Sequence, residues 1–430
     1  MKKLLIAATV VLVSSSPLVL LPMEKELTLT PKQVQKLTQN TTASLTQFKQ
    51  IPKNPRTITT ILTYKNKDLT EFKTSIQADT KLSISAIFLN AKGEPVFQLQ
   101  DGDYVAASQK SIVDDSIYNQ KTVDMTFWTK DGLTVYKEPY VLGTEKADSK
   151  LASFKPIKVS QAAQTHAGTY YLVDGEGWIN ASDLSTTDNR IEAVQKVLNE
   201  KYNNQERISV YVKQLDTDRV AAINDEKSMY AASVAKLGVL YYAQERLSQK
   251  KLSLSDEYQY TSAVNGFPGA YDPDGSGKIS KMPDDKNYSL ENLLKAVAQN
   301  SDNVATNILG YYVTNQYDKA FQKSVDKAAA TSWNMDKKEL TARAAGTLME
   351  AVYRQNGDII NYLSSTDYDG ERISKNIDVP VAHKIGDAYD FKHDVAIVYA
   401  DSPFILSIFT DKEGYDKITS IADDVYGILK

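Results

Sequence analysis

Three short polar strings in the second half of the chain constrain its fold more than any other feature. They are Ser233-Val-Ala-Lys236, Ser301-Asp302-Asn303 and Lys384-Ile385-Gly386, in that order along the 430 residues. Apolar runs flank each string, so each can end a helix or strand with polar side chains directed into a cleft. We therefore expect one domain that brings three distant segments to a single site.

The first string pairs a serine with a lysine one helical turn away. Residues three apart share a helix face, so if Ser233 opens the apolar run 234–247, Lys236 lies beside its hydroxyl. A lysine made neutral by burial or nearby positive charge can take the serine proton. Helix N-terminal N–H groups favour the developing oxyanion. The pattern predicts Ser233 as a nucleophile and Lys236 as its base.

The same serine–lysine spacing occurs twice more, at Ser248/Lys251 and Ser324/Lys327. Those lysines stand among charged residues that predict exposed helix surface, whereas Lys236 precedes an almost uncharged run. The context therefore favours the first match alone.

The second string lies between amphipathic runs at 290–299 and 304–312, which predicts a helix–helix junction. There Ser301 can relay a proton to a leaving nitrogen, and Asn303 can hydrogen-bond Lys236 and a substrate amide. The alternative is that Ser301 only caps the helix that follows.

The third string precedes two apolar runs, 394–400 and 404–409, that predict adjacent buried antiparallel strands. Lys384 would project from a preceding strand, hold a substrate carboxylate and help keep the base lysine neutral. Gly386 would let a substrate approach the backbone, and the N–H of Asp387 would complete an oxyanion hole with that of the serine. We therefore predict these three residues as substrate contacts.

Together the strings resemble the motif set of the penicillin-recognising serine enzymes, and most of all that of the class A beta-lactamases. The resemblance covers roughly residues 190–430 and includes the segments 301–309 and 393–398. It implies that Ser233 is acylated by a beta-lactam or a peptidoglycan stem peptide. It also implies the roles given above for the base, the proton relay and the carboxylate anchor.

Two departures from that family bear on turnover. Class A beta-lactamases carry a glutamate, with an asparagine four residues on, in an omega-shaped loop, and that glutamate activates the water that frees the acyl-enzyme. Here the second and third strings are only 83 positions apart, and the nearby acids Asp336 and Glu339 lack the partner asparagine. We expect both acids on the surface. Ile385 replaces a Thr or Ser, which removes a charge-assisted hydrogen bond of about 1.5–3 kcal/mol. The sequence predicts acylation with slow deacylation.

Composition excludes several other classes of protein. There is no cysteine for disulfides or thiolate metal sites, and three scattered histidines disfavour zinc chemistry, so we expect no cofactor or metal. A net charge of −4 without a basic stripe gives no nucleic-acid signature. The string 272–277 suggests a calcium loop, but Pro283 stands where an EF-hand needs glutamate, so we predict a turn-rich lip over the cleft.

The N-terminus predicts export. Two lysines precede a long uncharged apolar run, which is typical of a signal peptide or an uncleaved membrane anchor at residues 1–24. A polar helical segment and linker are expected at 25–56. Because cysteine is missing, we expect an extracellular, cell-wall-associated or membrane-anchored protein of the Gram-positive type.

An internal repeat follows the linker. The string 101–108 recurs as 174–182, each time after a short strand pattern, which predicts two small all-β modules at 57–120 and 121–187. With Gly177-Trp178, the second resembles the GW type of bacterial SH3-like domain, a family associated with cell-wall polymers. The resemblance implies a teichoic-acid or wall tether, and the alternative is a spacer.

The predicted fold is therefore multidomain. SH3-like β modules precede an α/β domain at 188–430, in which helices and a helical lobe flank an antiparallel sheet. The leading hypothesis is a serine acyl-enzyme hydrolase. The alternatives are a catalytically silent cell-wall binding protein and a pure wall-binding adaptor.

Overall fold

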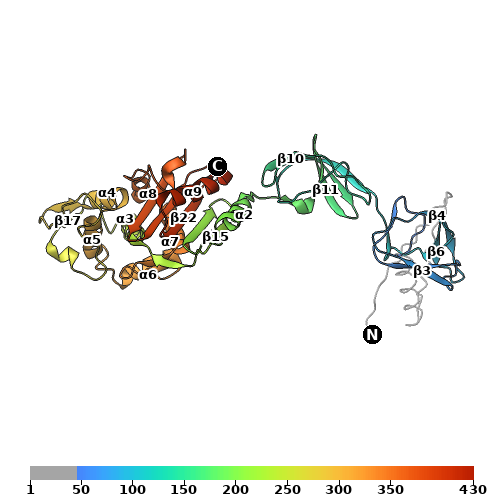
Figure 1. Cartoon of the computed structure of the whole chain (residues 1–430), viewed down its shortest axis with the longest axis horizontal. Coiled ribbons are helices and arrows are strands. Elements are labelled where there is room, and N and C mark those ends of the chain that lie inside the picture. The colour runs from blue at the N-terminus through green and yellow to red at the C-terminus, as the bar shows by residue number, and fades with distance from the viewer. Residues whose placement is uncertain (1–45) are drawn as a thin grey trace, which may run out of the picture. The chain divides into compact units, whose positions relative to one another are not determined.

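The computed structural model describes residues 46–430. The expected signal or anchor at 1–24 and most of the segment 25–56 lie outside these residues. The chain divides after Ser116 into two compact units (Figure 1). Within residues 46–430, no helix is both long and apolar enough to cross a membrane.

The first unit contains a small β module. Its five-stranded sheet has the order β3-β2-β6-β5-β4, and β1 pairs with β7. Phe97, Val105 and Ile112 are fully buried at its centre. The strands are β1 (Pro55–Thr57), β2 (Ile61–Tyr64), β3 (Phe72–Ile76), β4 (Ile84–Leu89), β5 (Pro95–Leu99), β6 (Tyr104–Ala106) and β7 (Ile112–Asp114).

The second unit begins with another β module. Its six strands have the order β13-β8-β10-β11-β12-β9. Its core includes Phe127, Val159 and Ile179, while Tyr170 and Trp178 form a separate aromatic cluster. The strands are β8 (Asn119–Thr129), β9 (Val135–Tyr136), β10 (Pro156–Thr165), β11 (Gly168–Val173), β12 (Gly177–Asn180) and β13 (Leu184–Ser185).

The sequence repeat corresponds to one hairpin in each module. Strand β5 pairs antiparallel with β6, so that Phe97 faces Val105. Strand β11 pairs antiparallel with β12, so that Leu172 faces Trp178. In each case the predicted strand precedes the repeated string, which forms the turn and the returning strand.

The C-terminal domain is built on a five-stranded antiparallel sheet. Its order is β15-β14-β22-β21-β20, which leaves β20 at an edge. The predicted pairing of two buried strands near residues 394–409 is confirmed by the β21–β22 ladder. The strands are β14 (Ile208–Gln214), β15 (Val220–Ile223), β20 (Val381–Ala388), β21 (Phe391–Val398) and β22 (Phe404–Asp411).

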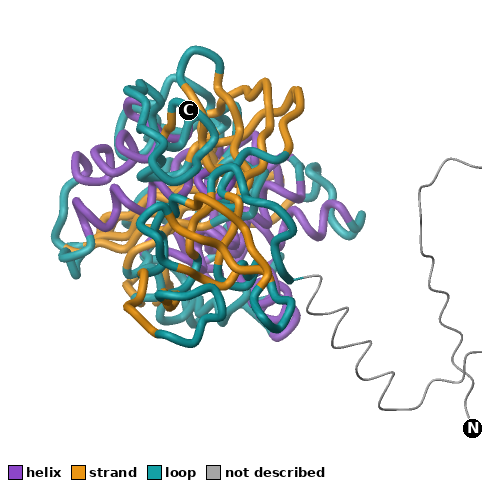
Figure 2. The backbone as a smooth tube through the Cα atoms, turned by 90° about the vertical axis from the view of Figure 1, so that its right-hand side faces the viewer, coloured by secondary structure: helices purple, strands orange, loops and turns teal. Residues whose placement is uncertain are grey.

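Two buried clusters cover the faces of this sheet. Helices α2 (Arg190–Tyr202) and α9 (Tyr415–Leu429) supply apolar side chains to one cluster. The larger cluster joins the other face to a helical lobe, whose α7 (Ala342–Gln355) contacts β14, β21 and β22. All the α-helices in residues 46–430 belong to this domain and are purple in Figure 2.

The helical lobe lies in the sequence between β15 and β20. Two short antiparallel pairs accompany it, β16 with β19 and β17 with β18. The remaining elements are β16 (Ser228–Tyr230), α3 (Leu237–Ser248), β17 (Glu257–Gln259), β18 (Asn287–Ser289), α4 (Leu290–Asn300), α5 (Asn303–Tyr312), α6 (Lys319–Ala329), β19 (Glu339–Thr341) and α8 (Asp358–Leu363).

The contact of α7 with the sheet predicts an unusual response to alanine. Alanine usually stabilises a helix relative to glycine by about 0.5–1 kcal/mol. At Gly346, however, a Cβ atom would lie 2.5 Å from the Tyr211 ring, and such overpacking costs about 1–3 kcal/mol. We expect Gly346→Ala to lower the free energy of unfolding in urea. The control Gly427→Ala in α9 meets no atom within 4 Å and should not lower it. Equal stability of the two variants would contradict this packing.

Candidate active site

Ser233 and Lys236 lie on one turn of 3-10 helix, Ala232–Lys236, that leads directly into α3. We predicted an α-helix from Ser233, but the first turn is a 3-10 helix. Residues three apart eclipse in a 3-10 helix, so the side chains of Ser233 and Lys236 lie more directly above one another than in an α-helix. Ser233 is 7 % exposed and Lys236 is fully buried. Ala232 has a φ of +49°, a left-handed conformation that is strained for a residue with a Cβ.

The Lys236 amine is held by two short hydrogen bonds. Nζ donates to the Ser301 carbonyl oxygen and to Asn303 Oδ1, both at 2.6 Å. Burial, and then the positive charges of Lys384 and Lys338, hold the pKa of Lys236 well below its usual range. A neutral amine has two N–H groups and one lone pair. A neutral Lys236 would use both hydrogens in the two short bonds and keep its lone pair to accept a proton.

The second string lies at the predicted junction, between α4 and α5. Ser301 ends α4 in the left-handed conformation, with a φ of +53°. Asp302, not Ser301, caps α5, because its carboxylate accepts from the Ala305 N–H at 2.8 Å. The alternative that Ser301 only caps the following helix is therefore wrong. Its hydroxyl instead accepts from Lys384 Nζ at 2.8 Å and lies 3.4 Å from Lys236 Nζ.

Lys384 extends from β20, the edge strand, as predicted. It is 1 % exposed, and its Nζ donates to the Ser301 hydroxyl and, at 3.0 Å, to the Ile385 carbonyl oxygen. Burial lowers the pKa of Lys384 to about 7, against the opposing charge of Asp394. The two lysines therefore meet at one serine hydroxyl, and burial lowers the pKa of both.

Gly386 is explained by packing inside the protein. A Cβ atom there would lie 2.6 Å from the Ala231 carbonyl oxygen and 3.0 Å from Val234. The glycine thus lets β20 pack closely on the segment that carries the nucleophile. We had assigned this glycine to the close approach of a substrate, whereas the contact that requires it is with Ala231.

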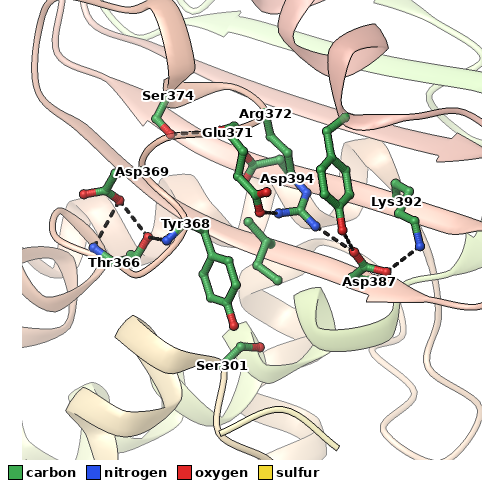
Figure 3. A network of polar contacts seen from close by, with 12 residues as sticks. Ser301, Thr366, Tyr368, Asp369, Glu371, Arg372, Ser374, Asp387, Lys392 and Asp394 are labelled. Atoms are coloured by element: carbon green, nitrogen blue, oxygen red, sulfur yellow. Dashed lines mark hydrogen bonds and ion pairs between the residues drawn. The ribbon is translucent and has the colours of Figure 1, made fainter.

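The Asp387 carboxylate is bound at the end of β20. Figure 3 shows Arg372 and Lys392 directed toward it from two sides, with donor distances of 2.9 and 2.5 Å. Tyr415 from α9 donates to the same carboxylate. These contacts hold the Asp387 side chain, and the backbone N–H of the same residue is the predicted second oxyanion donor.

His383 supports β20 from within the domain. Its Nδ1 lies 3.0 Å from Asp394 Oδ2 and its Nε2 lies 3.1 Å from Asp369. Although burial opposes the charge, these two carboxylates raise the pKa of His383 to about 9. In Figure 3 the Asp369 carboxylate also accepts hydrogen bonds from Thr366. The histidine is therefore a charged bridge between strand and loop at neutral pH.

The string 272–277 forms a loop clamped onto the second motif. Asn303 Nδ2 donates to the Asp272 carbonyl oxygen at 2.7 Å, and the Asp302 carboxylate accepts the N–H of Lys278 at 2.6 Å. Gly277 has a φ of +125°, and a Cβ there would lie 2.2 Å from the Asp302 carboxyl. Only glycine fits this contact. Asn303 keeps a second amide hydrogen for a substrate.

Sequence reasoning separated the site residues from the competing matches. Ser248, Lys251 and Lys327 are exposed, as are Asp336 and Glu339. It did not assign Asp302, Asn307, Lys338 or Arg372 to the site. The signal for Asn307 was present, since it follows Asn303 by four residues and so shares its face of α5.

The sequence profile of the Beta-lactamase enzyme family matches residues 189–429. The chain therefore belongs to this family, which has a serine hydrolase fold. The profile of a domain of unknown function, DUF5776, matches residues 47–113. None of the curated proteins matches the chain.

Solved structures are similar to a little more than half of the chain. PBP-A is 15 % identical over 56 % of this chain and 95 % of its own, with a TM-score of 0.46. The beta-lactamase of Sphaerobacter thermophilus is 14 % identical over 56 % and 94 %, with a TM-score of 0.45. The TLA-1 extended spectrum beta-lactamase is 18 % identical over 56 % and 99 %, with a TM-score of 0.45.

The depressed pKa of Lys384 predicts a pH-dependent stability that Lys384→Met removes. Lys384 loses its proton near pH 7 when folded, against an ordinary value of 10.5. Between these values the unfolded chain binds more protons, so this contribution to the free energy of unfolding rises with pH. Urea unfolding from pH 7 to about 9.5 should show the wild type gaining a few kcal/mol on the variant. The contribution of His383 to the free energy of unfolding falls with pH, because its pKa is raised in the folded protein. This residue is present in both the wild type and the variant. A difference that does not change with pH would contradict the burial of this charge.

Proposed function

We propose that the chain is a serine acyl-enzyme hydrolase of the beta-lactamase or penicillin-binding type. It acts on the amide of a beta-lactam or of a peptidoglycan stem peptide. The observation that carries this proposal is the environment of Lys236, one turn from Ser233. The amine is fully buried and donates to Ser301 and Asn303, and burial holds its pKa well below the usual range. A buried lysine without a chemical role would make the fold less stable than an apolar residue at the same position.

Acylation follows from the positions of these groups. The Lys236 lone pair takes the Ser233 proton as the oxygen attacks the amide carbon. The oxyanion lies between the N–H groups of Ser233 and Asp387. The proton then reaches the leaving nitrogen through the Ser301 hydroxyl, which contacts both lysines.

The substrate class follows from charge. Three buried amines lie around the site, those of Lys236, Lys384 and Lys338. The charges of the last two add to burial in lowering the pKa of Lys236. A substrate carboxylate would restore the full charge of Lys384 and be attracted by it. Ile385 supplies no hydroxyl to that carboxylate, so binding is weaker than in relatives with Thr or Ser.

Slow deacylation is part of the proposal. Asp336 and Glu339, the acids nearest in sequence to the position of the family's glutamate, are both exposed. Neither is available to activate a water at Ser233. The acyl-enzyme is therefore expected to accumulate.

Intact mass spectrometry of the whole chain incubated with benzylpenicillin tests this function. The wild type should gain one penicilloyl group that persists, because the site has the groups for acylation but no residue assigned to activate the water that would hydrolyse the acyl-enzyme. Ser233→Ala should gain none. Lys236→Met should react at least about a hundredfold more slowly, since it lacks the general base.

Two other outcomes would contradict the proposal. A wild type that forms neither adduct nor product with the penicillin or with stem peptides would favour the catalytically silent wall-binding protein. An adduct that survives Ser233→Ala would place the nucleophile elsewhere.

We also propose that the β modules tether an exported protein to the Gram-positive cell wall. In the second module Tyr136, Tyr140 and Tyr170 gather, with ring centroids 4.9–6.4 Å apart. Tyr170 is buried, whereas Tyr136 and Tyr140 are half-buried and offer ring edges and hydroxyl groups to a polymer such as teichoic acid. This supports the SH3-like, GW-type assignment of that module.

Sedimentation with purified Gram-positive cell walls tests the tether. The whole mature chain should pellet with walls. A variant lacking residues 47–187 should stay in the supernatant and still form the penicilloyl adduct. If both proteins pellet equally, the modules are spacers.

A further inference from the structure

Tyr271 is held against the site by a residue of α5. Asn307 accepts the Tyr271 N–H at 2.7 Å through Oδ1 and donates to the Tyr271 carbonyl oxygen at 2.8 Å through Nδ2. Asn307 is fully buried and lies one turn after Asn303. Both backbone groups of Tyr271 are thus fixed, so the direction of its side chain is set by the motif helix and not by the loop alone.

The Tyr271 ring fills the space beside the base. Its centroid lies 4.5 Å from Lys236 Nζ, and its hydroxyl donates to the carbonyl oxygen of Ala232, the residue before the nucleophile, at 3.3 Å. The side chain is buried. The aromatic side chain therefore occupies the space from Lys236 Nζ to the Ala232 carbonyl oxygen, where a water or a carboxylate could otherwise stand.

Lys338 closes the same region from the segment between α6 and β19. Its Nζ lies 4.5 Å from the Tyr271 centroid and donates to the Gly269 carbonyl oxygen at 3.0 Å. Its own carbonyl oxygen accepts the Ala231 N–H at 2.7 Å. Lys338 is 6 % exposed. The short segment that carries Lys338, where the sequence comparison with the family expects the omega loop, thus covers the Tyr271 ring.

The Tyr271 phenol is not a base for a water. Burial raises the pKa of Tyr271 well above its usual value of 10, so the phenol keeps its proton and directs it to Ala232. The Lys338 amine is directed to a backbone carbonyl. Hydrolysis of an acyl-Ser233 ester needs a water oxygen that attacks the carbonyl carbon, loses its proton to a base and releases the serine oxygen, which is reprotonated. On this side of the site the ring occupies the space that such a water would need.

We propose that Tyr271 is a water-excluding residue that prolongs the acyl-enzyme at Ser233. The inference rests on the proposed function and names the residue that regulates its second step. If the site only lacked a group to activate water, water could still enter it and deacylation would be slow. A buried ring held through its backbone instead makes exclusion of water a built feature of the fold.

The test is the decay rate of the penicilloyl adduct, followed by intact mass after excess benzylpenicillin is removed, so the acylation rate does not enter. Tyr271→Ala opens the space while both bonds to Asn307 remain, and we expect its adduct to decay at least about tenfold faster than that of the wild type. Tyr271→Phe keeps the ring and should decay within about twofold of the wild type. Tyr271→Leu, which opens less space, should lie between them and serves if the alanine variant does not fold.

The outcomes separate the two proposals. Adducts on all variants that decay at the wild-type rate would overturn the role of Tyr271 and leave Ser233 acylation standing. Equal acceleration in Tyr271→Phe and Tyr271→Ala would also overturn it, because the hydroxyl and not the ring would then control decay. No adduct on the wild type would overturn the proposed function, and this inference with it.

Discussion

The burial of two lysine amines at one serine hydroxyl is the constraint on which the rest of the site depends. Lys236 and Lys384 are removed from water, and the positive charge of Lys384 further lowers the pKa of Lys236. Such groups lower the stability of a fold unless they shed their protons or gain partners. Here Ser301 lies between them and Asn303 binds the first. The domain thus gives up stability to hold one amine ready to accept a proton.

Backbone strain lies at the same positions. Ala232 directly precedes the first motif, and Ser301 is the first residue of the second. Both have left-handed φ values. Strain of this kind costs about 1–3 kcal/mol per residue and persists only where surrounding contacts fix it. At Ala232 the contact is the hydrogen bond from the Tyr271 hydroxyl. Next to Ser301, the Asp302 carboxylate accepts from the N–H groups of Ala305 and Lys278. Site geometry and loop geometry are therefore parts of one arrangement.

Much of this domain could be predicted from sequence because its signals are local. Amphipathic periodicity placed α4 and α5 on either side of Ser301, and the apolar runs gave β21 and β22. The reason for Gly386 could not be predicted, because it depends on the approach of Ala231 from a distant segment. Tyr271 was equally hidden: its position follows from Asn307, and a tyrosine in a turn-rich loop gives no sign of a backbone partner on a helix. The 3-10 start at Ala232 reflects packing against β20, which no local propensity encodes.

The most direct test of this account is the pKa of Lys236 in the folded protein. It can be read from the carbon and nitrogen chemical shifts of isotopically labelled lysine side chains, with Lys236→Met assigning the signal. The account predicts a neutral amine at pH 7, whose titration moves to higher pH when Lys384→Met removes a neighbouring positive charge. A Lys236 signal that stays charged through pH 9 would contradict it, because an ammonium cannot accept the Ser233 proton.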